Sequence, residues 1–129
     1  MLFRSIAVSA AVVAAAAALR PPATAPRSHI VRMAGGRFVP AELVIQSGDT
    51  VHFVNGSGGP HNVAFSDLVG APAAALRRVM TDTVAPLAGP LLVLAEERYT
   101  IVFNKVPAGR YPYVCIPHQA TMKGVLTIR

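Results

Sequence analysis

The most chemically versatile part of the sequence is a short stretch near its end. Within eight residues it brings together a thiol, an imidazole and a thioether, on Cys115, His118 and Met122. A second imidazole, His61, stands 54 residues before Cys115 and follows the glycine-rich stretch 56–60. Two histidines, one cysteine and a weak axial methionine are the donor set of electron-transferring copper sites. The sequence therefore predicts one copper ion, cycling between Cu(I) and Cu(II), held by His61, Cys115, His118 and Met122.

Short β-type runs separated by turn signals predict the frame that positions these ligands. The runs cover residues 29–33, 38–46, 50–55, 61–66, 98–104, 111–115 and 123–129. Pro40 suggests an edge or a bend within the second run, and residues 71–80 favour a short helix within a long connection. Seven or eight short strands at close spacing are typical of an all-β sandwich. Because strand side chains alternate, Tyr111, Tyr113 and Cys115 share one face, and we expect the thiol to point inward.

Two motifs resemble a known family. Pro60-His61-Asn62-Val63, together with the stretch 111–122, resembles the plastocyanins and pseudoazurins of the cupredoxin family. The resemblance covers most of the chain after residue 30. It implies a Greek-key β-sandwich and one-electron transfer. It also implies that His61, Cys115 and His118 are equatorial copper ligands and that Met122 is the axial one.

The position of the methionine departs from the family pattern. Three residues separate His118 from Met122, whereas plastocyanin and pseudoazurin have four at this place and amicyanin has two. The family tolerates variation in the length of this loop, so we expect the sulfur of Met122 to reach the copper. The alternative is that Met122 only fills the core.

Residues next to the ligands predict the reduction potential of the site and the route by which electrons reach it. Pro117 has no N–H to donate to the Cys115 sulfur, which leaves thiolate charge uncompensated and predicts a lowered reduction potential. The resemblance implies that the backbone N–H of Asn62 bonds to this sulfur and that its side chain ties the two ligand loops together. It also implies that electrons pass through an exposed edge of His118. The patch around that edge would include Gly58, Pro60, Pro117 and Ala120.

The N-terminal 25 residues have the features of a signal peptide. Arg4 supplies a positive charge, residues 6–19 form an uncharged apolar run, and Ala23-Thr24-Ala25 offers a cleavage site. The run is shorter than the roughly 20 residues that span a bilayer, although an uncleaved membrane anchor is the alternative. We therefore expect export to the periplasm or the cell exterior, with residues 26–129 forming the copper-binding domain and no stable membrane span after processing.

Composition and charge indicate which kinds of molecule the protein binds. The chain has a net charge of +6, its Lys and Arg residues are scattered, and aromatic residues make up only 6% of it. Nucleic-acid binders usually show a basic stripe interleaved with aromatics, so we expect no nucleic acid. We expect a monomer that docks transiently with redox protein partners near His118, and its modest positive field favours acidic ones.

Other functions would use the same donors differently. A periplasmic copper carrier or chaperone would deliver the metal instead of electrons. A Cys–His hydrolase would need a spaced base and an orienting group, but His118 lies only three residues from Cys115. A two-copper oxidase centre would need a second cysteine, and the chain has one. Structural zinc usually prefers more Cys or His. We therefore expect an electron carrier and no enzyme.

Overall fold

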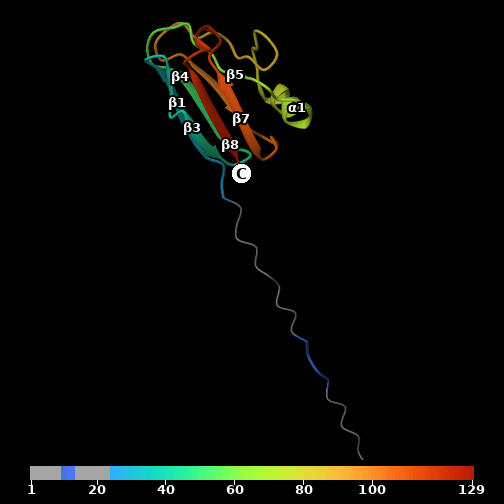
Figure 1. Cartoon of the computed structure of the whole chain (residues 1–129). Coiled ribbons are helices and arrows are strands. Elements are labelled where there is room, and N and C mark those ends of the chain that lie inside the picture. The colour runs from blue at the N-terminus through green and yellow to red at the C-terminus, as the bar shows by residue number, and fades with distance from the viewer. Residues whose placement is uncertain (1–9, 14–23) are drawn as a thin grey trace, which may run out of the picture.

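Two four-stranded sheets packed face to face make up the domain (Figure 1). The structure, a computed structural model, describes residues 10–13 and 24–129. Its strands, within those residues, are β1 (Ser28–Ala34), β2 (Arg37–Val39), β3 (Glu42–Ile45), β4 (Thr50–Asn55), β5 (Ala64–Phe65), β6 (Arg98–Val102), β7 (Gly109–Val114) and β8 (Lys123–Ile128). A helix, α1 (Gly70–Val79), lies in the long connection between β5 and β6, and a 3-10 turn, η1 (Ile116–His118), follows β7. The predicted all-β sandwich with one short helix is confirmed.

The order of the strands shows how the chain passes between the sheets. One sheet has the order β2-β1-β4-β6 and the other has the order β3-β8-β7-β5. The pairs β1–β4 and β3–β8 are parallel, and the other pairs are antiparallel. The run predicted over residues 38–46 is divided into β2 and β3, which belong to different sheets. The chain bends after Val39, at Pro40, where the sequence suggested an edge or a bend. Pro40, which cannot donate a ladder hydrogen bond, stands at this crossing.

The core between the sheets is built around Tyr113 of β7. Its ring makes edge-on contacts with Phe38 and Phe53, at centroid distances of 4.7 and 5.6 Å, and also packs against Phe65 at 5.6 Å. Gly124 on the neighbouring strand β8 leaves room for this ring, since a Cβ atom there would lie 2.4 Å from Tyr113 Cζ. Tyr113 stands two residues before Cys115, so this packing fixes the strand that carries the thiol.

The strand predicted over residues 61–66 was too long. Only Ala64–Phe65 is a strand, and His61 instead forms an isolated bridge with Leu92.

Most of the predicted signal peptide, residues 1–9 and 14–23, lies outside the described residues. In the part of the chain that the structure describes, no helix is long and apolar enough to cross a membrane.

Candidate metal centre

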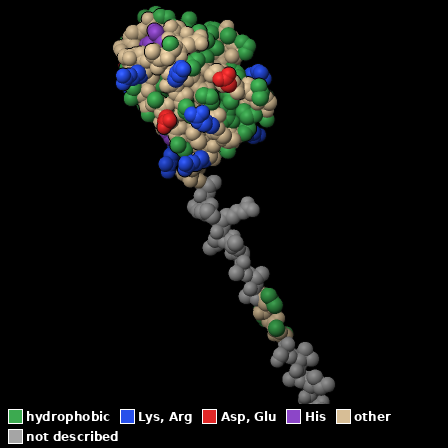
Figure 2. All heavy atoms as spheres, viewed as in Figure 1, with side chains coloured by type: hydrophobic (Ala, Val, Ile, Leu, Met, Phe, Trp, Pro, Cys, Tyr) green, Lys and Arg blue, Asp and Glu red, His purple; other side chains and the backbone are tan. Residues whose placement is uncertain are grey.

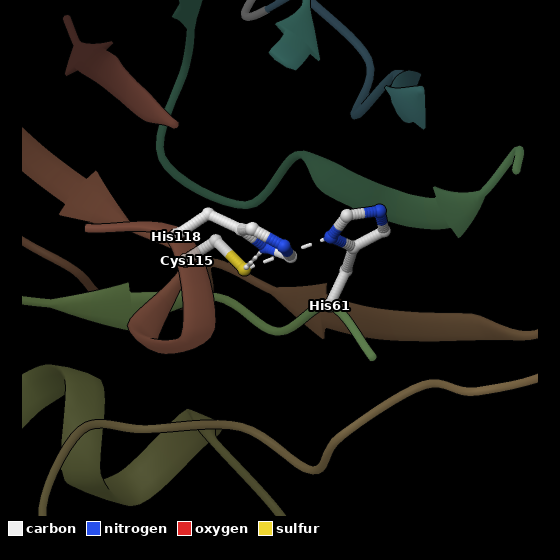
Figure 3. Close-up of side chains that lie close together, drawn as sticks. All are labelled: His61, Cys115 and His118. Carbon is white, nitrogen blue, oxygen red and sulfur yellow. Dashed lines mark hydrogen bonds between the residues drawn. The ribbon is translucent and has the colours of Figure 1, made fainter. Parts of the chain in front are cut away.

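Three of the four predicted ligands meet at the end of the sandwich toward which β4 and β7 run. His61 lies in the loop after β4, Cys115 directly follows β7, and His118 ends η1. The Cys115 sulfur lies 3.7 Å from Nδ1 of His61 and 3.5 Å from Nδ1 of His118. Figure 3 shows the three side chains pointing toward one another from two separate loops. Residues that are distant in sequence therefore present one sulfur and two nitrogen atoms to a common point.

These separations fit a single metal ion. A late first-row metal such as zinc bonds nitrogen at about 2.0 Å and sulfur at about 2.3 Å, so trigonal angles place the two donor types about 3.7 Å apart. The three ligand atoms all lie within 4.8 Å of one another. A thiolate with two imidazoles matches the softness of copper, whereas hard cations such as Mg²⁺ and Ca²⁺ prefer oxygen ligands. The chemistry of the donor set thus fits the predicted copper.

A backbone carbonyl selects the tautomer of His61 that suits metal binding. Its Nε2 lies 3.2 Å from the carbonyl oxygen of Ser57. A carbonyl oxygen only accepts hydrogen bonds, so Nε2 must carry the hydrogen, and the neutral ring keeps a free lone pair on Nδ1. That is the atom that faces Cys115. A backbone group thereby orients the ring and leaves Nδ1 available as a ligand.

The backbone of His61 is clamped by the connection between α1 and β6. His61 N–H donates to the carbonyl of Leu92 at 3.0 Å, and Leu92 N–H donates back to His61 at 2.8 Å. Asn55 supports the same connection, because its Nδ2 lies 3.0 Å from the carbonyl oxygen of Leu94. Gly59 packs closely here, and a Cβ atom on it would lie 3.1 Å from the Leu92 carbonyl. This support of His61 was missed from the sequence.

Cys115 is fully buried, as the inward orientation predicted. Burial raises the pKa of its thiol, and the nearby backbone N–H groups of Asn62 and His118 lower it, but they only partly oppose that rise. A buried thiolate therefore needs a cation beside it, which a bound metal supplies. The effect of the Asn62 N–H on this pKa agrees with the predicted position of Asn62 beside the sulfur. The N–H of His118 donates to the Cys115 carbonyl at 3.0 Å, which the sequence did not indicate.

The side chain of Asn62 connects three segments of the site. Its Oδ1 accepts a hydrogen bond from the N–H of Ile116 at 2.9 Å, and its Nδ2 donates to the carbonyl of Gly89 at 3.2 Å. Asn62 itself is buried. The predicted tie between the two ligand loops is confirmed, and it extends to the connection that also clamps His61.

Met122 lies at the right place in the chain to approach the site, directly before β8. Its backbone N–H donates to the carbonyl of His118 at 2.8 Å, and its carbonyl accepts from Cys115 N–H at 3.1 Å. Its side chain is fully buried. The three-residue spacing therefore closes into a tight turn that brings the Met122 backbone against both neighbouring ligands.

His118 and its surroundings reach the surface. The ring of His118 is partly exposed, whereas His61 is buried. The residues predicted to surround it, Gly58, Pro60, Pro117 and Ala120, are all exposed. Ile116 adds an apolar side chain that is 41% exposed. The site thus has one buried side and one side that opens to solvent through a single imidazole.

Known proteins support the same conclusion. Residues 29–129 match the family model of copper binding proteins, plastocyanin/azurin family. A plastocyanin from Synechococcus sp. (strain JA-2-3B'a(2-13)) is 34% identical over 119 residues, which are 88% of this chain and 82% of that protein. An amicyanin from Paracoccus versutus is 34% identical over 82 residues, which are 64% of this chain and 51% of that protein.

The fold has solved counterparts as well. An oxidised mutant of amicyanin superposes with a TM-score of 0.59 and 30% identity, covering 79% of this chain and 82% of the other. The family match, the fold and the His–Cys–His cluster confirm the predicted copper cofactor and the predicted role in electron transfer instead of enzymatic catalysis. The chain belongs to the plastocyanin/azurin family of copper-binding proteins, the cupredoxins.

Proposed function

We propose that His61, Cys115, His118 and Met122 are the four ligands through which this chain holds its electron-carrying copper. Copper, when bound, supplies the one-electron couple between Cu(I) and Cu(II). The chain's own residues fix the donors in advance: the Ser57 carbonyl selects the tautomer of His61, and Asn62 braces the loop of Cys115. Because these contacts hold the ligand side chains in place before copper binds, the ligands need to move little when the copper gains or loses an electron.

The observation that carries this proposal is the convergence of the Cys115 sulfur with Nδ1 of both histidines, at 3.7 and 3.5 Å. The test is to load the purified protein with Cu(II) and to record its absorption and EPR spectra. We expect an intense blue thiolate-to-copper band, which Cys115→Ser abolishes. A colourless site that exchanges its copper rapidly would favour the carrier or chaperone function, and an unchanged band in Cys115→Ser would refute the ligand set.

The electron route leads through the partly exposed ring of His118. Among the residues around it, Gly58, Pro60, Pro117 and Ala120 are exposed and either small or apolar. An uncharged surface of this kind favours brief docking of redox proteins, since small weak interfaces release quickly. The chain acts as a monomer in this proposal, with one docking surface for both electron donor and acceptor.

Export and processing complete the proposal. The apolar run of residues 6–19 and the Ala23-Thr24-Ala25 motif direct the chain to the periplasm or the cell exterior. Cleavage after Ala25 leaves the domain of residues 26–129. N-terminal sequencing of the protein recovered from the exporting cell tests this: a mature chain beginning at Pro26 supports it, and an intact Met1 would indicate an uncleaved anchor.

A further inference from the structure

The end of the domain opposite the copper ligands carries an unpaired group of cations. We call this group the basic pole and define it as Arg27, Arg78, Lys105, Arg110 and Arg129. All five are exposed. Within the described residues the ion pairs are His29–Asp49 and Arg32–Glu96, so none of the five pairs with an acidic side chain there. Figure 2 shows Lys and Arg side chains gathered where the N-terminal segment joins the domain.

Backbone contacts place these five residues at one end. Thr50 N–H at the start of β4 donates to the Arg27 carbonyl, and Arg129 N–H donates to the Ile45 carbonyl at the end of β3. Arg110 pairs with Thr127, near the end of β8. The Arg78 guanidinium lies 3.5 Å from the carbonyl of Lys105. Strand β7 runs from Gly109 at this end to Val114, one residue before Cys115, so the basic pole and the copper ligands lie at opposite ends of the sandwich.

The acidic residues do not balance the pole. None of the five acidic residues other than Asp49 forms an ion pair with a pole cation within the described residues. Glu42 pairs with Val125 in the middle of β8, Glu96 and Glu97 lie beside Asn55 at the copper end, and Asp67 and Asp82 flank α1. Asp49 lies at the pole but is buried, and its two oxygens already accept hydrogen bonds from Arg27 N, the His29 ring and Gln46 N. The pole therefore carries five cationic side chains and one buried carboxylate that is already hydrogen-bonded.

A hollow of about 160 Å³ opens within the pole. Arg27, Arg129 and His29 line it, together with the buried carboxylate of Asp49. Two arginine residues line one hollow, and guanidinium groups bind phosphate through paired hydrogen bonds. Val44, also on its wall, is 51% exposed, so an apolar side chain stands among the cations.

We infer that the basic pole docks on an anionic phospholipid surface, with one headgroup phosphate in the hollow between Arg27 and Arg129. The cations match the negative charge of the lipid headgroups, and an exposed apolar side chain such as Val44 suits the boundary between headgroups and acyl chains. The large hydrophobic side chains exposed on the described residues include no aromatic ring, which argues against base stacking with nucleic acid.

This docking would orient the carrier. With the basic pole on the lipid, the sandwich stands between the surface and the copper ligands, so the exposed edge of His118 faces away. The uncharged surface around His118 then stays free for a redox protein. The inference is independent of the ligand assignment, because none of the pole residues contacts the copper ligands.

The test is binding of the copper-loaded mature chain, residues 26–129, to lipid vesicles at low salt. Vesicles of phosphatidylcholine alone are compared with vesicles that also contain phosphatidylglycerol, since binding to the former measures the part of the affinity that does not depend on lipid charge. We expect tighter binding to the anionic vesicles. The double variant Arg27→Gln/Arg129→Gln should lose about 25-fold of that preference, because each cation near a membrane contributes about fivefold.

The matched control removes two exposed cations from elsewhere, Arg37→Gln/Arg98→Gln, and should change binding less than about twofold. Equal losses in both variants, or equal binding to both kinds of vesicle, would overturn the inference. Displacement by inorganic phosphate at constant ionic strength would mean that the hollow holds a free anion. Tighter binding to polyglutamate than to the anionic vesicles would mean that the pole serves an acidic protein. Both results would overturn lipid docking while leaving the blue absorption band intact.

Discussion

Asn62 Oδ1 accepts a hydrogen bond from the N–H of Ile116 at 2.9 Å, joining two loops that are 54 residues apart in sequence. Asn62 follows His61 and Ile116 follows Cys115, so one bond fixes the spacing of two ligands. The Asn62 backbone N–H meanwhile lies near the Cys115 sulfur and lowers the pKa of its thiol. The side chain and the backbone of one residue thus have separate roles, which mutation can separate.

Replacing Asn62 with alanine removes the brace and keeps the backbone N–H near the sulfur. The N–H of Ile116 and the carbonyl of Gly89 then lose a partner, and each such loss costs about 1–3 kcal/mol. We expect the copper-loaded variant to lose at least about 1 kcal/mol of unfolding free energy, measured with denaturant, and to show broadened EPR lines. The control Asn104→Ala, at an exposed turn, should change stability by less than about 0.5 kcal/mol. Equal effects would contradict a special role for Asn62.

Met122→Leu tests the axial ligand. Leucine has nearly the same volume, so packing changes little, but the thioether donor is lost. Because a donor stabilises the more positive oxidised ion, its loss should raise the reduction potential, by about 60 mV for a tenfold shift in the equilibrium. Met33→Leu is the matched control, since Met33 is equally buried on β1. A potential that stays at the wild-type value in both variants would mean that Met122 only fills the core.

The two buried tyrosines of β7 should respond oppositely to loss of their hydroxyl groups. The Tyr111 hydroxyl donates to the Pro107 carbonyl at 2.6 Å, whereas the buried Tyr113 hydroxyl has no partner within the described residues. We expect Tyr111→Phe to destabilise the protein by about 1 kcal/mol and Tyr113→Phe to be neutral or stabilising. Urea unfolding of the two variants measures this. Comparable destabilisation by both would mean that the Tyr113 hydroxyl is bonded in solution.

The ligands could be predicted from the sequence because chemistry restricts them to few residue types. Cys115, His118 and His61 are recognisable from their side chains and from their positions in loops that flank β-type runs. Strand β4 was also predicted with its observed bounds, since Val51 and Phe53 share one face of an alternating run and a turn precedes it. In each case the side chain itself carries the signal.

The support behind the ligands could not be predicted in the same way. Leu92 and Gly89 act through their backbone carbonyls, which every residue possesses, so no residue type marks them. Pro40 suggested a bend between β2 and β3, but the sheet that each strand joins is a long-range choice that a local pattern does not contain. Asp49 is similar, because its partners Arg27 and His29 stand more than 19 residues away.

Asp49 makes stability depend on pH in the acidic range. Burial alone raises the pKa of this carboxyl, but hydrogen bonds from Arg27, His29 and Gln46 together outweigh burial and lower the pKa from its ordinary value of 3.8. A folded-state pKa below the unfolded one gives stability that is present above 3.8 and is lost as the pH falls through the folded value.

The test subtracts the unfolding free energy of Asp49→Asn from that of the wild type between pH 6 and the acid limit of folding. We expect the difference to be constant above about pH 5 and to shrink as the pH falls below 3.8. Protonation of the copper ligands affects both proteins equally and cancels. A difference that does not vary with pH would show that the Asp49 charge contributes no stability.

Ala120→Glu tests the docking surface around His118 without knowledge of the natural partner. Two copies of a carrier can exchange electrons with each other, and the rate is measurable by NMR line broadening in mixtures of oxidised and reduced protein. If exchange requires the two His118 edges to meet, a carboxylate beside each edge must be desolvated and repels its counterpart, so the rate should fall at least about tenfold. The control Ala108→Glu places the same charge on an exposed turn at the basic pole and should leave the rate within about twofold. Equal rates in both variants would mean that electrons leave the site by a route other than the His118 edge.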